Sequence, residues 1–274
     1  MKMMKNLLCV ALLLFACLHG QAGDKHPIAI VAHRGYWTAP GVCEAQNSVA
    51  SLREAQHFGC WGSEFDVHLT ADSIIVVNHD PTREGREIQT STYKDLRNLL
   101  LANGEPLPTL CEYLAQGVVC TSTKLVLEFK PQYSPEREDL LLEKTFDALR
   151  LYGLFDPGRV AFISFSHYIC QRIAQLAPEF SNQYLNGDIA PEQLHLEGIN
   201  GIDYRYKVFY KHPEWVEDAH RCGMSVNAWV VNREEDIHRM IEMGVDFLTT
   251  NDPSLVREIL GPRELSSRIP TRSE

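Results

Sequence analysis

Short runs of apolar and β-branched residues alternate along this chain with longer segments whose apolar residues recur every three or four positions. The first pattern is typical of buried strands, and the second is typical of helices that cover a sheet with one face. Residues 28–32 and 125–129 show the strand pattern, and residues 48–58 show the helix pattern. Further strands are predicted at residues 63–69, 74–77, 160–165, 183–185, 201–204, 226–231 and 247–249, and further helices at 93–101, 110–115, 139–151, 168–176, 215–221, 234–243 and 255–260.

The alternation of strands with helices predicts an α/β fold with parallel strands joined by right-handed crossovers. About eight such units over roughly 250 residues fit a TIM (β/α)₈ barrel. A doubly wound open sheet is the alternative, but the glycine-rich phosphate turns typical of that fold do not occur. Because no linker rich in Pro, Gly or Ser divides the chain, we expect a single barrel domain over residues 23–260 and a polar tail over 261–274.

The N-terminus has the pattern of a secretory signal peptide over residues 1–22. Lys2 and Lys5 precede an apolar run at residues 7–18, and small residues then offer a cleavage site. Cleavage there leaves 252 of the 274 residues, and the loss of two lysines changes the net charge from −10 to −12. The alternative is a lipoprotein signal with the anchor at Cys17. Both interpretations predict an exported protein, most simply a periplasmic one.

Composition narrows the function classes. The chain carries 36 acidic against 26 basic residues and shows no basic stripe, which argues against a nucleic-acid partner. No apolar run beyond the signal is long enough to span a membrane. The remaining cysteines have no C-x-x-C spacing, so a structural zinc site is not expected. We expect mostly buried free thiols at Cys43, Cys60, Cys111, Cys120, Cys170 and Cys222.

Charged residues and histidines lie at the ends of four neighbouring predicted strands. The active sites of barrels are built at the C-terminal ends of their strands. Residues two apart on a strand point to the same side, so the paired positions on one strand should converge. The candidates are His33 and Arg34 after the first strand, Glu64 and Asp66 on the second, His79 after the run at 74–77, and Glu128 and Lys130 at the strand 125–129.

These residues and their neighbours resemble the glycerophosphodiester phosphodiesterase family, in particular its exported bacterial members. The resemblance covers about residue 28 to residue 253, with the motifs in the family's order. It implies a TIM barrel, one divalent cation (Ca²⁺ or Mg²⁺), and hydrolysis of glycerophosphodiesters to glycerol phosphate and an alcohol. The motifs are His33-Arg34-Gly35, Glu64-Phe65-Asp66, Val76-Val77-Asn78-His79-Asp80, Leu127-Glu128-Phe129-Lys130, Ala228-Trp229-Val230-Val231-Asn232, Gly244-Val245-Asp246 and Thr250-Asn251-Asp252-Pro253.

Three of the candidates suit a metal site. Glu64, Asp66 and Glu128 offer the oxygen ligands that a hard divalent cation prefers. The alternative is that they only pair with nearby cations. Three inward carboxylates against two cations leave an excess of negative charge, however, which a metal ion would relieve.

The other candidates suit the phosphodiester itself. His33 and His79 are expected to act as an acid/base pair, because imidazole titrates near working pH. Arg34 can bind two phosphate oxygens at once, and Lys130 can supply a point charge. Trp229 is expected either to contact the glycerol or the alcohol group, or to serve only in core packing.

The chain departs from the family pattern in two places. Family members often carry Pro-Glu-Asn-Thr where this chain has Ala45-Gln46-Asn47-Ser48, so Gln46 is not expected to be a metal ligand. Asn47 is expected either as a helix N-cap or as a hydrogen-bonding group of the site. The segment 83–92 is short where many members have an insertion that shapes the substrate pocket, so the preferred alcohol group stays open.

Three functions are therefore weighed. A metal-dependent hydrolase of small glycerophosphodiesters is favoured. The alternatives are another phospholipase-like phosphodiesterase on the same barrel, which would need an exposed apolar or basic loop, and a non-catalytic phosphodiester-binding protein. The sequence does not indicate an oligomeric state.

Overall fold

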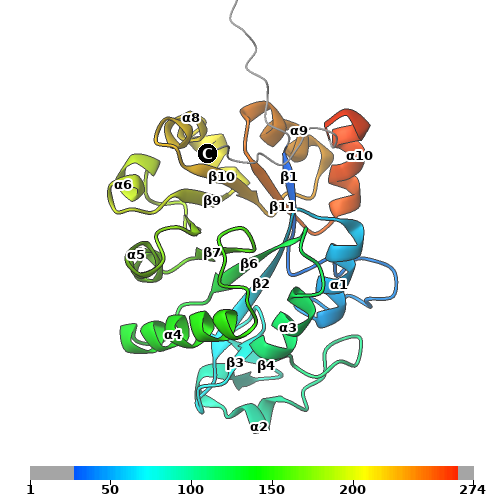
Figure 1. The fold of residues 1–274 in the computed structure, drawn as a ribbon. Helices are drawn as coiled ribbons and strands as arrows, with labels where there is room; N and C mark the ends of the chain where they lie inside the picture. The colour runs from blue at the N-terminus through cyan, green and yellow to red at the C-terminus, as the bar shows by residue number, and fades with distance from the viewer. Residues whose placement is uncertain (1–27, 265–274) are drawn as a thin grey trace, which may run out of the picture.

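The computed structural model describes residues 28–264, and within them eight parallel strands close into a barrel (Figure 1). Closure comes from β1, which pairs with β11 on one side and with β2 on the other. The TIM barrel predicted from the alternation is thereby confirmed. The barrel strands are β1 (Ala29–Ala32), β2 (Gly62–Leu69), β6 (Lys124–Phe129), β7 (Val160–Ser164), β8 (Ser181–Tyr184), β9 (Gly201–Arg205), β10 (Ser225–Trp229) and β11 (Phe247–Thr250).

Helices surround the barrel, as Figure 1 shows. Several begin at a serine or threonine whose side chain accepts a hydrogen bond from a backbone N–H of the first turn. That N–H has no partner within the helix, so the capping side chain satisfies it. Ser48 accepts from Ser51, Ser134 from Arg137, and Ser166 from Ile169. The helices are α1 (Val49–Phe58), α3 (Leu110–Gly117), α4 (Pro135–Leu151), α5 (His167–Leu176), α6 (Pro191–Leu196), α7 (Tyr206–Lys211), α8 (Glu214–Arg221), α9 (Glu234–Met243) and α10 (Pro253–Glu264).

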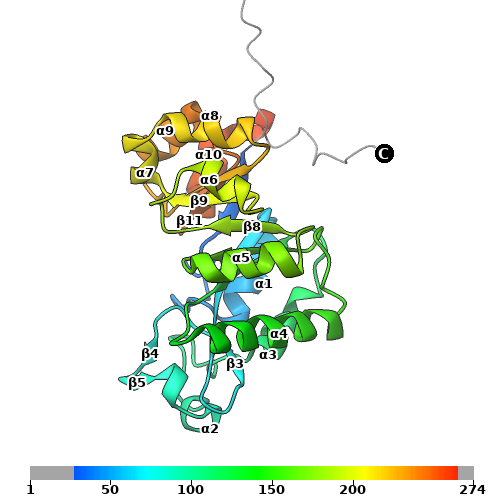
Figure 2. The same ribbon diagram turned by 90° about the vertical axis from the view of Figure 1, so that its left-hand side faces the viewer.

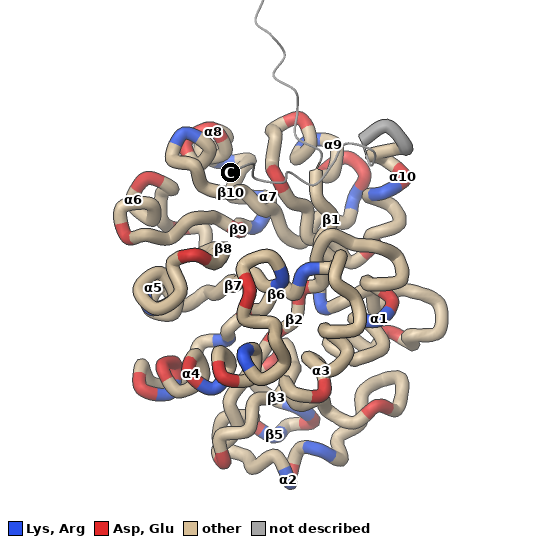
Figure 3. The backbone as a smooth tube through the Cα atoms, viewed as in Figure 1, with Lys and Arg blue, Asp and Glu red and all other residues tan. Residues whose placement is uncertain are grey.

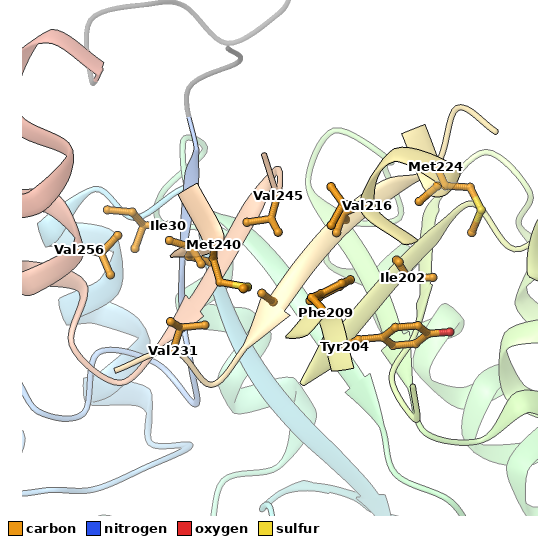
Figure 4. Packing of buried hydrophobic residues seen from close by; sticks show 14 of the residues in the cluster. Ile30, Ile202, Tyr204, Phe209, Val216, Met224, Val231, Met240, Val245 and Val256 are labelled. Atoms are coloured by element: carbon orange, nitrogen blue, oxygen red, sulfur yellow. The ribbon is translucent and has the colours of Figure 1, made fainter. Parts of the chain in front are cut away.

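The main core lies between the barrel and its helices. On β9, Ile202 and Tyr204 face outward and pack with Phe209 of α7 and Val216 of α8 (Figure 4). Burial of such side chains supplies most of the favourable free energy of folding. The barrel interior holds a smaller apolar cluster of Val31, Val126, Ala161, Ile163 and Leu185. Successive residues of a strand therefore alternate between the helix layer and the interior, where the functional residues must lie.

An excursion between β2 and α3 departs from the predictions. The run at 74–77 forms β3 (Ile75–Val77), but it pairs antiparallel with β2 and is no barrel strand. The helix predicted at 93–101 ends at Leu96, because the N–H groups that would extend it bond elsewhere: the Leu99 N–H donates to the Leu96 carbonyl, and the Leu101 N–H donates to the Glu105 carbonyl. The excursion, outside the ring of helices in Figure 2, also contains β4 (Thr82–Arg83), β5 (Arg86–Glu87), a 3₁₀ helix (Ile88–Thr90) and α2 (Tyr93–Leu96).

The ends of the chain and its surface bear on other predictions. The signal peptide at 1–22 and the tail beyond residue 264 lie outside the described residues. Helix α10 extends past the predicted domain end and is interrupted at Gly261 (φ 67°). Acidic and basic positions are interspersed, both occurring along α4 (Figure 3). None of the described helices is long and apolar enough to cross a membrane.

The six cysteines of residues 28–264 are free, as predicted. Only Cys60 and Cys170 are buried, however, so the prediction of mostly buried thiols was wrong. Cys43 and Cys111 are exposed because they lie in the β1–α1 loop and on the outer side of α3, where the packed layers do not cover them.

Candidate active site

Two neighbouring strands bring the three candidate carboxylates together. Asp66 of β2 is in register with Glu128 of β6, and Glu64 precedes Asp66 by one full alternation. Their outward neighbours Phe65 and Phe129 are buried against the helices, which turns all three carboxylates into the barrel. One ligand oxygen from each lies within 4.8 Å of the others. The sequence prediction of a convergent carboxylate cluster is confirmed in its geometry.

Lys130 lies inside this cluster. Its Nζ is 2.7 Å from Asp66 Oδ1 and 2.6 Å from Glu128 Oε1. Burial would lower the pKa of Lys130, but the two carboxylates raise it, so the ammonium stays charged. Burial would likewise raise the pKa of Asp66, but Lys130 and the Asn47 amide hold it below its ordinary range.

The other two carboxyl groups, those of Glu64 and Glu128, have too little positive charge near them to offset their burial. Burial, followed by repulsion from Asp66, raises the pKa of Glu128 to about 8. Burial and the charges of Asp66 and Glu128 also raise the pKa of Glu64. Glu64 Oε1 is buried and has no hydrogen-bond partner among the described residues. An unpartnered oxygen and three crowded carboxylates are what a hard divalent cation would relieve, so these residues fit one.

His33 follows β1 directly and points its ring into the same end of the barrel. Its Nδ1 lies 2.6 Å from Asn251 Oδ1, so Nδ1–H donates to the amide and Nε2 keeps its lone pair. Burial, and then the charge of Arg34, lowers the pKa of His33 to about 4. The imidazole is therefore neutral and able to accept a proton at Nε2.

His79 follows β3, which the pairing with β2 holds beside the site. Its Nδ1 donates to Asp80 Oδ1 at 2.6 Å, and its side chain is 37% exposed. Burial and the Lys130 charge lower its pKa. His68 of β2 donates from Nε2 to the His79 carbonyl at 3.2 Å, which anchors the backbone at this position. His79, like His33, thus has its Nδ1 fixed, and its Nε2 has no hydrogen-bond partner among residues 28–264.

Arg34 is held by its backbone and by its side chain. It has a left-handed conformation (φ 58°), and its N–H donates to Glu64 Oε2 at 2.7 Å. Its NH1 donates to Gln46 Oε1 at 2.6 Å, whereas its Nε is buried without a partner among the described residues. Arg34, Gln46 and His79 line one pocket of about 300 Å³ that extends toward Arg83 and Leu101.

Asn47 resolves an alternative that the sequence left open. Its Nδ2 donates to Asp66 Oδ2 at 2.7 Å, and its Oδ1 accepts the Asp66 N–H at 3.2 Å. The N-cap of α1 is Ser48 rather than Asn47. Asn47 is therefore a hydrogen-bonding group of the site that orients Asp66.

Trp229 lies apart from the pocket that Arg34 and His79 line. It packs edge-on against Phe165, with ring centroids 5.5 Å apart, and its Nε1 donates to the Asp203 carbonyl at 2.8 Å. The half-buried ring packs against the apolar cluster of the barrel interior, at the C-terminal end of β10. Both of its predicted roles, packing and substrate contact, remain compatible with this position.

Sequence reasoning missed three side chains that orient the predicted residues. Asp80 is adjacent to His79, and Asn251 follows β11 at the same end of the barrel as His33. His68 continues the alternation of Glu64 and Asp66 along β2. The strand-end rule and the period of two were signals for Asn251 and His68, but neither signal identifies which residue of a neighbouring strand or loop is the partner.

Comparisons with known proteins agree with this geometry. Residues 32–255 match the Glycerophosphoryl diester phosphodiesterase family. A glycerophosphodiester phosphodiesterase from Parabacteroides distasonis is 41% identical, with a TM-score of 0.83 over 86% of this chain and 98% of that one. The glycerophosphodiester phosphodiesterase of Caldanaerobacter subterraneus is 28% identical over 82% of this chain and 94% of its own length.

An Oleispira antarctica phosphodiesterase, solved in complex with the product sn-glycerol-3-phosphate, shares the fold, with 22% identity and a TM-score of 0.72 over 85% of this chain and 96% of that one. The family match runs from the end of β1 past β11 and includes every candidate site residue. The chain therefore belongs to the glycerophosphoryl diester phosphodiesterase family and is a phosphoric diester hydrolase.

Proposed function

We propose that the chain hydrolyses small glycerophosphodiesters to glycerol phosphate and an alcohol, with one divalent cation, Ca²⁺ or Mg²⁺, and an acid/base pair of histidines. The observation that carries the proposal is the convergence of three buried carboxylates with His33 and His79. Each of these histidines has its Nδ1 bonded and, within the described part of the chain, no partner at its Nε2. The Oleispira antarctica protein, which shares the fold and was solved with sn-glycerol-3-phosphate, supports the same class of substrate.

Glu64, Asp66 and Glu128 would hold the cation, with Asn47 orienting Asp66. When bound, a divalent cation supplies positive charge for the phosphate and lowers the pKa of a hydroxyl that it contacts. Lys130 stays charged between Asp66 and Glu128, where it compensates part of their charge and can reach a phosphate oxygen. Arg34 presents its guanidinium from the adjacent pocket and can bind two further oxygens.

The two imidazoles can carry the proton transfers. In the first step, the glycerol 2-hydroxyl oxygen forms a bond to phosphorus while the bond from phosphorus to the alcohol oxygen breaks. One histidine accepts the hydroxyl proton at Nε2, and the other, in its protonated form, donates a proton to the departing alcohol. Water then opens the cyclic 1,2-phosphate with the two roles exchanged. The neighbouring hydroxyl has the advantage of proximity over free water.

A panel of substrates tests the activity. Purified mature protein is assayed with glycerophosphocholine, glycerophosphoethanolamine and lysophospholipids, with and without added Ca²⁺ or Mg²⁺. Metal-dependent release of glycerol phosphate from the two water-soluble diesters is expected. Preference for lysophospholipids would favour the phospholipase-like alternative, and binding without turnover of any diester would favour a non-catalytic protein.

A substrate without the 2-hydroxyl tests the route. A 2-deoxy glycerophosphodiester keeps the phosphate and the alcohol group, so it should bind comparably. It should turn over at least about 100-fold more slowly, because the tethered nucleophile is absent. Cleavage of the 2-deoxy compound at the normal rate would show that water attacks phosphorus directly.

We also propose that the enzyme acts outside the cytoplasm, on the basis of the signal-like residues 1–22. Mass spectrometry of the protein from its native cell envelope tests this. A mature N-terminus at Gly23 is expected, lipidated Cys17 would indicate the anchored alternative, and an intact Met1 on active protein would contradict export.

A further inference from the structure

Gln46 contacts the phosphate-binding arginine with a neutral group. Its Oε1 lies 2.6 Å from Arg34 NH1, and both side chains line the pocket that also contains His79. An amide oxygen orients a guanidinium by a hydrogen bond without cancelling its charge, whereas a carboxylate of the same shape would form an ion pair with it. Residue 46 can therefore change the charge of the site while its geometry stays the same.

Arg34 is the cation of this pocket that remains able to bind a ligand. Arg83 also lines the pocket, but its nitrogens donate to the carbonyls of Leu99 and Leu100 and to Asn78 Oδ1. Arg34 Nε is buried without a partner among the described residues, and no carboxylate side chain in them forms an ion pair with its guanidinium. The two acidic residues of the pocket, Glu44 and Asp80, are exposed to solvent, and neither forms an ion pair with Arg34 in the described structure. Asp80 accepts a hydrogen bond from His79 instead.

The net charge of the metal-loaded site depends on whether residue 46 is neutral or acidic. With a divalent cation bound, all three carboxylates would be ionised, and the cation, Lys130 and Arg34 together would leave the site with one net positive charge. That value matches the single negative charge of a phosphodiester. A glutamate at position 46 would make the loaded site neutral, so a monoanion would lose attraction, and a dianion would lose about twice as much in free energy.

We propose that Gln46 is a positioning residue that holds Arg34 without neutralising it, and that it thereby sets how strongly the site binds anions. The inference rests on the proposed function, because it requires phosphate at Arg34. It predicts that residue 46 acts more strongly on the dianionic product, glycerol phosphate, than on the monoanionic diester.

Two substitutions separate charge from geometry. Gln46→Glu keeps the acceptor for Arg34 and adds a charge, whereas Gln46→Met removes the acceptor and adds none. The matched control is Gln175→Glu, because Gln175 accepts from Arg172 NH1 at 2.7 Å in an equivalent pair on the outer side of α5. Calorimetry measures binding of sn-glycerol 3-phosphate to the metal-saturated proteins at pH 8, and KM and kcat are measured for glycerophosphoethanolamine.

Gln46→Glu should weaken glycerol phosphate binding about 100-fold and raise KM about 10-fold, with a much smaller change in kcat. Gln46→Met should lower kcat, because Arg34 loses its orienting partner, and Gln175→Glu should match the unsubstituted protein. Equal losses for the monoanion and the dianion in Gln46→Glu, or no loss for either, would overturn the inference. If the unsubstituted metal-loaded protein binds no glycerol phosphate, the proposed function fails as well.

Discussion

Arg34 combines an unusual backbone conformation with a functional side chain. Left-handed φ values cost about 1–2 kcal/mol for residues other than glycine. Here the conformation (φ 58°) directs the N–H to Glu64 Oε2 and the guanidinium to Gln46. Strain of this kind persists where neighbouring contacts determine the conformation. One residue thus links the carboxylate cluster to the pocket that would bind phosphate.

Arg34→Lys tests the guanidinium. The charge is retained, but the planar group that can hold two phosphate oxygens is lost. We expect kcat/KM for a glycerophosphodiester to fall about 10- to 100-fold, the equivalent of one or two charge-assisted hydrogen bonds. Steady-state kinetics of the metal-saturated variant measure it. Near-normal turnover would mean that Arg34 has a structural role and does not bind phosphate.

The loop between β1 and α1 is the element that fixes Arg34, and it is packed tightly against the helix. Gly35 has φ 77°, and a Cβ there would lie 2.6 Å from Ser51 Cβ. Ser51 Oγ in turn donates to the Arg34 carbonyl at 3.0 Å. A side chain at position 35 would therefore push the helix away from the loop.

Gly35→Ala should lower the free energy of unfolding by about 2–4 kcal/mol, because it adds an overpacking cost to an unfavourable φ. Gly41→Ala is the matched control, since Gly41 in the same loop has φ 86°, but apart from its two chain neighbours no described residue has an atom within 4 Å of the position that a Cβ would occupy. It should cost only about 1–2 kcal/mol. Urea unfolding of both variants measures the difference. Equal losses would show that the contact with Ser51 contributes nothing.

Elements that are formed by interactions between residues close in sequence could be predicted, and elements that depend on contacts with other parts of the chain could not. Barrel strands such as 125–129 were predictable because an apolar run between helical patterns reports burial locally. The antiparallel pairing of β3 was not, because it depends on hydrogen bonds to β2 rather than on its own residues. The end of α2 at Leu96 was missed because the chain after it turns, with the Leu101 N–H bonded to the Glu105 carbonyl instead of to a carbonyl of the helix.

The residues of the site also fall into a group that local sequence patterns predict and a group that they do not. Glu64, Asp66, Glu128 and Lys130 were predictable because alternation along two strands places them on one face. The link between His33 and Asn251 joins residues 218 positions apart and required the closure of the barrel. The match of Gln46 to Arg34 was missed because a substitution in a motif does not show which side chain it contacts.

At the scale of the whole molecule, the barrel interior contains an acid outside the proposed chemistry. Asp203 of β9 is buried beside Asn227, and its Oδ1 has no hydrogen-bond partner among the described residues. Burial raises the pKa of Asp203 to about 8. The folded protein therefore keeps this proton up to about pH 8, whereas the unfolded chain releases it near pH 4. The contribution of Asp203 to stability falls as pH rises between these values.

Asp203→Asn should remove this pH dependence. Relative to the unsubstituted protein, the variant should gain stability from pH 5 to pH 8, by roughly 1 kcal/mol per pH unit. Urea unfolding at the two pH values, with chelator present throughout, measures the gain. The exposed Asp147→Asn serves as the control for loss of one carboxylate. A constant difference between Asp203→Asn and the unsubstituted protein at both pH values would mean that Asp203 is ionised when folded.

A metal-loaded carboxylate cluster that supports turnover is the central claim. Its most direct test is a titration of chelator-stripped protein with Ca²⁺ or Mg²⁺, in which hydrolysis of glycerophosphoethanolamine is followed at each addition. Activity should be absent at the start and reach a plateau with one ion bound per chain. Glu128→Gln should require at least about 100-fold more ion, because it removes one of three ligands. Full turnover by the stripped protein, or saturation with metal without turnover, would contradict the claim.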